Sequence, residues 1–148
     1  MNLDTFPAHQ TTCKGELNLL AAKYFPNEDR RTFNIEVVHG PKYKTDCNSC
    51  QAGVTYISKA FDYLNSGTII WNKNIIEQTQ DQVLVEIGPY RRTIKLGSEK
   101  ACVVPVEPTL ENLLNWFVKQ FQGQLELAHT NIITMCSEDE SLSLTLGY

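Results

Sequence analysis

The stretch from Phe33 to Leu64 constrains the fold most, because two different hydrophobic periods follow one another within it. Apolar and polar residues alternate from Phe33 to Val38, which is the two-residue period of a strand. After the break at Gly40-Pro41, apolar residues recur every three or four positions, which predicts a helix from Asp46 or Cys47 to about Leu64. The chain must therefore bury one face of a strand and one stripe of a helix in a shared core.

The remaining segments predict more elements of both kinds. Helical periodicity predicts helices from about Cys13 to Tyr24 and from about Thr109 to Gln122. Short apolar runs bounded by turn residues predict strands at Thr68–Trp71, Val83–Ile87, Arg92–Leu96, Ala101–Val106, Leu125–Ala128, Ile132–Met135 and Leu142–Leu146. We therefore expect residues 1–148 to form a single α+β domain, with one mixed sheet of about five to seven strands and about three helices packed on it.

Composition narrows the function classes. The net charge of −4 argues against a protein that coats nucleic acid through a broad basic face. The first residues lack the basic and apolar regions of a signal peptide, and no apolar run approaches the ~20 residues of a membrane helix. Five cysteines, an odd number, favour reduced thiols. We expect a cytoplasmic protein, or one delivered into the cytosol of a target cell, with no membrane partner.

The pair Cys47-x-x-Cys50 carries the sharpest chemical signal, because it stands where a predicted strand gives way to a predicted helix. Two thiolates in such a turn can bind one zinc ion, and the helix N-terminus favours the thiolate form. Cys13, His9 and His39 are candidates for the missing ligands. Three other interpretations stay open: buried core thiols, a redox dithiol, and a cysteine nucleophile with His39 as its base.

The order of Cys13 and Glu16, a strand, and then the stretch Thr45-Asp46-Cys47-Asn48-Ser49-Cys50-Gln51 resembles the cytidine-deaminase-like zinc superfamily over residues 11–71. The last stretch is similar to the turn of bacterial toxin deaminases. The resemblance implies that Cys13, Cys47 and Cys50 hold zinc and that Glu16 carries protons. For such an activity, residue type alone suggests Tyr43 as an aromatic side chain that stacks on the base, and Arg91 and Arg92 as contacts to phosphates.

Two hypotheses about function follow. The first is a zinc-dependent deaminase-like hydrolase that acts on a nucleobase or nucleotide, as an effector or toxin domain. The alternative is a non-catalytic module that binds a protein partner, such as an immunity protein, a phage inhibitor or an adaptor. Any zinc would then be structural, with His9 or His39 as a fourth ligand.

Overall fold

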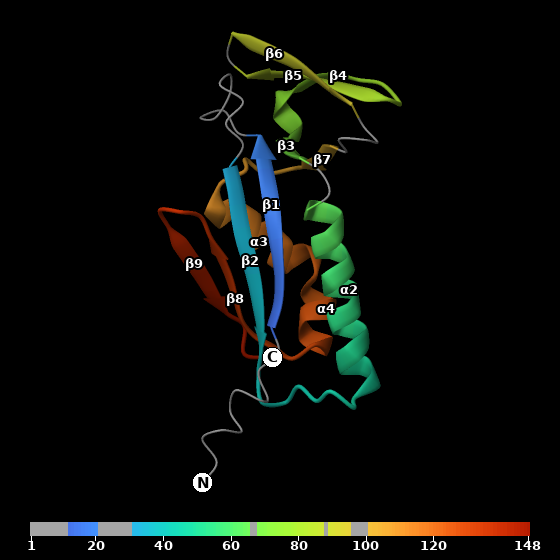
Figure 1. The fold of residues 1–148 in the computed structure, drawn as a ribbon, viewed down its shortest axis with the longest axis vertical. Helices are drawn as coiled ribbons and strands as arrows, with labels where there is room; N and C mark the ends of the chain where they lie inside the picture. Colours follow the sequence, from blue (N-terminus) through green and yellow to red (C-terminus); the bar gives the residue numbers. More distant parts are fainter. Residues whose placement is uncertain (1–11, 21–30, 66–67, 88, 96–100) are drawn as a thin grey trace.

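The computed structural model describes residues 12–20, 31–65, 68–87, 89–95 and 101–148 of the chain. Within these ranges the strands form two sheets, a six-stranded one, called the main sheet below, and a three-stranded one, called the small sheet (Figure 1). The strand order of the main sheet is β7-β3-β1-β2-β8-β9.

Four antiparallel strands make up most of the main sheet. They are β1 (Thr12–Leu20), β2 (Arg31–His39), β8 (Thr130–Cys136) and β9 (Ser141–Thr145), each paired antiparallel with the next. Two parallel strands, β3 (Thr68–Trp71) and β7 (Ala101–Val104), extend the sheet beyond β1. The mixed sheet is therefore a four-stranded antiparallel sheet with a short parallel extension.

Helices cover one face of this sheet. They are α2 (Asn48–Asn65), α3 (Leu110–Gln120) and α4 (Gln122–Leu127), and α3 lies behind the strands in Figure 1. The side chain of Thr109 caps α3 by accepting a hydrogen bond from the Asn112 N–H at 3.2 Å. The rings of Phe61 of α2 and Phe117 of α3 pack in a tilted arrangement, with centroids 5.3 Å apart, in the core between helices and sheet.

The small sheet is an excursion between α2 and α3. It comprises β4 (Ile75–Gln78), β5 (Gln82–Ile87) and β6 (Tyr90–Lys95), and a short 3-10 turn, η2 (Asn72–Asn74), leads into it from β3. Its buried residues Val83, Val85 and Ile94 cluster with Ile70 of β3, so this sheet packs on the end of β3. It stands at one end of the long axis of the molecule (Figure 1).

The structure confirms the α+β class, with helices packed on a mixed sheet. The strands predicted at Val83–Ile87 and Arg92–Leu96 correspond largely to β5 and β6, which pair with each other in the separate small sheet instead of joining a single sheet. No helix in the described part of the chain is long and apolar enough to cross a membrane.

Two predicted elements were wrong. The predicted helix from Cys13 begins as strand β1, because pairing with β2 from Thr12↔Val38 to Leu19↔Arg31 overrides the helix propensity of this segment. The predicted strand Leu125–Ala128 falls mainly in helix α4. Leu125 and Ala128, three positions apart, are both fully buried, whereas Leu127 is 47% exposed, which is a helical pattern of burial.

Candidate functional site

A row of polar side chains crosses the face of the main sheet opposite the helices. The pairings Lys14↔Glu36, Glu36↔Thr134 and Thr134↔Ser143 align one residue from each of β1, β2, β8 and β9. We call these four residues the polar row. Neighbouring strands lie about 4.8 Å apart, so the row presents a cation, a carboxylate and two hydroxyls in sequence across the sheet.

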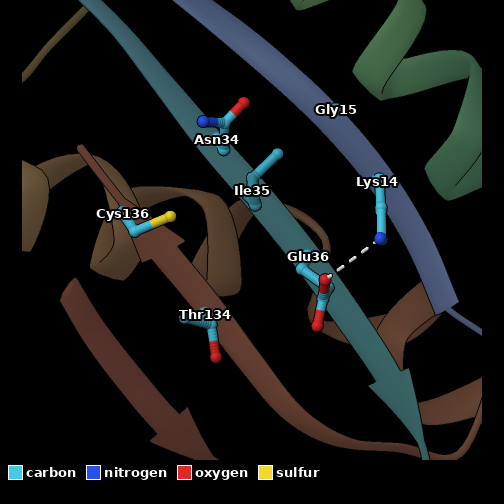
Figure 2. A pocket seen from close by; sticks show the side chains of 7 residues that line it. All are labelled: Lys14, Gly15, Asn34, Ile35, Glu36, Thr134 and Cys136. Carbon is cyan, nitrogen blue, oxygen red and sulfur yellow. Dashed lines mark ion pairs between the residues drawn. The ribbon is translucent and has the colours of Figure 1, made fainter. Parts of the chain in front are cut away.

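A cavity of about 620 Å³ lies over this face. Figure 2 shows its lining, which comprises Lys14, Gly15, Asn34, Ile35, Glu36, Thr134 and Cys136. The Lys14 ammonium lies 3.8 Å from a Glu36 carboxylate oxygen, and the Thr134 and Ser143 hydroxyls are hydrogen bonded at 2.7 Å. The Lys14 side chain is largely exposed and that of Glu36 is partly exposed, so a ligand can reach both the ammonium and the carboxylate.

The alternation of β2 explains why this face is polar. Phe33, Ile35 and Val37 turn toward the helices and are at most 2% exposed, which leaves Asn34 and Glu36 on the opposite side. The sequence therefore contained a signal for this site, namely the polar half of the strand alternation. In the sequence alone that half indicates only a strand, because the partner residues on β8 lie about a hundred positions away in the chain.

Cys47 and Cys50 lie where the sequence pattern predicted, at the start of α2. Cys47 directly precedes the helix and is partly exposed, while Cys50 in its first turn is 1% exposed. The Cys47 Sγ accepts a hydrogen bond from the Cys50 N–H at 3.4 Å. The structure thus brings these two thiols together.

The other proposed zinc ligand and the proton carrier have different surroundings from those expected. Cys13 and Glu16 belong to strand β1, where the register sets them opposite Val37 and Asn34. Among the described residues there is no group of three or more His, Cys, Asp or Glu side chains that could hold a metal ion.

The two histidines proposed as alternative ligands are His9 and His39. His9 lies outside the described residues. His39 ends β2 and is fully buried, and its ring stacks on Tyr43 with centroids 4.5 Å apart. Burial lowers the pKa of His39 below 6.5, against a smaller opposing effect of a hydrogen bond to the backbone of Ala128.

The three residues proposed to bind substrate are spread over the molecule. Tyr43 is 4% exposed, and its hydroxyl accepts a hydrogen bond from Gln51 Nε2 at 3.0 Å. Arg91 and Arg92 lie on β6, where the Arg91 Nε is 2.7 Å from a Glu86 carboxylate oxygen. The small sheet that carries both arginines stands at the opposite end of the molecule from the start of α2 (Figure 1).

Comparison with known proteins identifies the fold. The chain matches no family model and no curated protein sequence. Its structure is similar to a catalytic-residue mutant of Plasmodium vivax 6-pyruvoyltetrahydropterin synthase, with a TM-score of 0.58 and 12% identity over 94% of this chain and 98% of that one. An uncharacterized protein from Wolinella succinogenes gives a TM-score of 0.53 and 10% identity over 93% and 97%. The Plasmodium falciparum synthase gives 0.51 and 10% over 94% and 98%.

These similarities overturn the deaminase interpretation. The fold is that of 6-pyruvoyltetrahydropterin synthase, and it spans nearly the whole chain instead of residues 11–71. The zinc, hydrolase and deaminase assignments were therefore wrong. The physical cause is the segment after Thr12. It is a strand inside the main sheet, paired with β2 on one side and β3 on the other, not the ligand-bearing helix that the resemblance required.

Proposed function

We propose that this protein binds a heterocycle of the pterin class over the polar row of the main sheet. The observation that carries the proposal is the cavity of about 620 Å³, in which the Lys14 ammonium and the Glu36 carboxylate lie side by side. Its size falls within the range of about 300–1,000 Å³ common for small-molecule sites. The similarity of the fold to 6-pyruvoyltetrahydropterin synthase supports this class of ligand.

The chemistry of the pair suits one edge of a pterin. That edge carries a keto oxygen, a ring N–H and an exocyclic amino group in a row. The Glu36 carboxylate can accept hydrogen bonds from the ring N–H and the amino group, and the Lys14 ammonium can donate one to the keto oxygen. Asn34 stands two residues from Glu36 on the same face and provides a further donor and acceptor.

A binding titration with pterin itself, followed by fluorescence anisotropy of the ligand, tests the proposal. Glu36→Gln keeps the shape of the side chain but removes the charge. Hydrogen bonds to charged groups contribute about 1.5–3 kcal/mol, so we expect affinity to fall roughly 10–100-fold. The exposed Lys14–Glu36 pair itself adds at most about 1 kcal/mol to stability, so the variant should stay folded.

Glu111→Gln is the matched control, because Glu111 is an exposed carboxylate in the first turn of α3, on the helical side of the sheet. This variant should bind pterin as the unmodified protein does. Adenosine, which lacks the same edge, should compete weakly. The proposal fails if the unmodified protein does not bind pterin, or if the Glu36 and Glu111 variants bind it equally well.

A further inference from the structure

The turn before α2 holds a cysteine where a helix cap usually has an oxygen. The Cys47 carbonyl accepts the first helical hydrogen bond, from the Gln51 N–H at 3.0 Å. Its Sγ accepts a hydrogen bond from the Cys50 N–H at 3.4 Å and lies 3.2 Å from the Ser49 Oγ. Cys47 is thus an N-cap residue with sulfur in the capping position.

The two thiols at this cap differ in environment. A hydrogen bond from the Cys50 thiol, followed by one from the Ser49 hydroxyl, lowers the pKa of Cys47 to about 7. Burial and the neighbouring Cys47 raise the pKa of Cys50, which is 1% exposed. The first turn of α2 carries no acidic residue, and the positive end of the helix favours a thiolate at the cap; the carboxylate next in sequence, Asp46, precedes Cys47 in the loop. An accessible thiolate therefore adjoins a buried thiol.

The surrounding loop holds the cap in place. Gln51 donates from its Nε2 to the Thr45 carbonyl at 2.9 Å and to the Tyr43 hydroxyl at 3.0 Å. Tyr43 is in turn stacked on His39 at the end of β2. The turn is therefore tied both to its own helix and to the main sheet.

We propose that Cys47 and Cys50 form a redox-active dithiol that exchanges with low-molecular-weight disulfides. The Cys47 thiolate attacks one sulfur of the small disulfide, whose S–S bond breaks and releases one thiolate that takes up a proton. Cys50 then loses its proton and attacks the Cys47 sulfur of the mixed disulfide, which expels the second small thiol. The two protein thiols are oxidised to a disulfide, and one small disulfide is reduced to two thiols.

This assignment is independent of the pterin proposal, because the cap uses the start of α2 and none of the residues that line the cavity. It differs from the structural zinc interpretation in its requirement for two sulfurs and no further ligand. Cysteine pairs of this spacing at a helix start are suited to exchange because the outer sulfur attacks and the inner one resolves.

Incubation of the full chain with oxidised glutathione, followed by trypsin and mass spectrometry, tests the proposal. Lys44 and Lys59 bound a tryptic peptide, residues 45–59, that contains both cysteines and no others. We expect this peptide to lose two hydrogen atoms. Cys50→Ser should stop at a glutathione adduct on Cys47, and Cys47→Ser should give no disulfide in the peptide.

Cys136→Ser is the control, because Cys136 is partly exposed but lies on β8. It should form the same disulfide as the unmodified chain. In the reduced, unmodified chain, the rate of alkylation of Cys47, followed in the same tryptic peptide, should rise with pH around a midpoint near 7. A persistent adduct on Cys47 of the unmodified chain, preferential reaction at Cys136, or a midpoint near the ordinary thiol value of about 8.5 would overturn the proposal. So would a metal ion that copurifies and blocks both sulfurs.

Discussion

Gly53 allows a sharp test of how closely α2 packs against α4. A Cβ atom added at this position would lie 2.8 Å from the Gln124 carbonyl oxygen and 2.9 Å from the Ala128 nitrogen. Both are backbone atoms, so the contact cannot be relieved by a change of side-chain rotamer. The helices would have to separate, or the start of α2 would have to shift.

The expected cost follows from two opposing effects. Overpacking of a close contact costs about 1–3 kcal/mol, whereas replacing glycine by alanine inside a helix favours the helix by about 1 kcal/mol. Because two of the contacts are shorter than 3.0 Å, we expect the packing cost to prevail. Gly53→Ala should therefore lower the free energy of unfolding by about 1–2 kcal/mol, and the larger Gly53→Val should lower it further.

Gly123→Ala supplies the control within the same pair of helices. A Cβ at Gly123 of α4 would have no heavy atom within 4 Å, so the helix effect acts alone and should raise stability by about 0.5–1 kcal/mol. Urea unfolding followed by circular dichroism measures both changes as shifts in Cm at constant slope. If Gly53→Ala is as stable as the unmodified chain or more so, the close α2–α4 contact is wrong.

Two further variants probe a helix cap and a buried histidine. Thr109→Ala removes the oxygen that accepts a hydrogen bond from the Asn112 N–H, so it should lower the free energy of unfolding in urea by about 1 kcal/mol. Thr109→Ser keeps a hydroxyl at this position and should be nearly as stable as the unmodified chain. Burial lowers the pKa of His39 below 6.5, so the unfolded chain binds more protons as the pH falls through that value. The free energy of unfolding should therefore be highest above pH 6.5 and decrease as the pH falls below that value. His39→Gln should make this decrease smaller. If the pH dependence is the same in the variant, the lowered pKa of His39 is not its cause.

The sequence predicted elements well where one hydrophobic period was strong. The strand predicted from the alternation in β2 and the helix predicted from the three-to-four spacing in α2 are both present. In each element one side is buried in the core and the other is more exposed, so the hydrophobic period is regular. β1 was mistaken for a helix because its residues suit a helix locally, and its true partner, β2, is identified only by tertiary pairing. β4, with one residue partly buried at its start and three exposed, gave no period to detect.

Whether a candidate site could be predicted from the sequence also depends on how close its residues lie in the chain. The Cys47–Cys50 turn was evident because both residues belong to one short segment. The polar row was not, because Glu36 gains its neighbours Lys14 and Thr134 from strands before and after it in the chain. Local spacing reveals sites formed within one turn, whereas sites assembled across a sheet require the strand register.

The register between β2 and β8 also has a consequence for folding kinetics. Asn34 pairs with Cys136, so the centre of the main sheet closes a loop that contains α2, the small sheet and both later helices. Pairings of such long sequence separation slow folding, because the chain loses the entropy of loop closure before contacts repay it. The cavity, which takes Glu36 from one side of this loop and Thr134 from the other, should form only at the end of refolding. Recovery of ligand binding would then lag behind recovery of helix content. A chain released before β8 is synthesised would lack the part of the cavity lining that β8 supplies, Thr134 and Cys136.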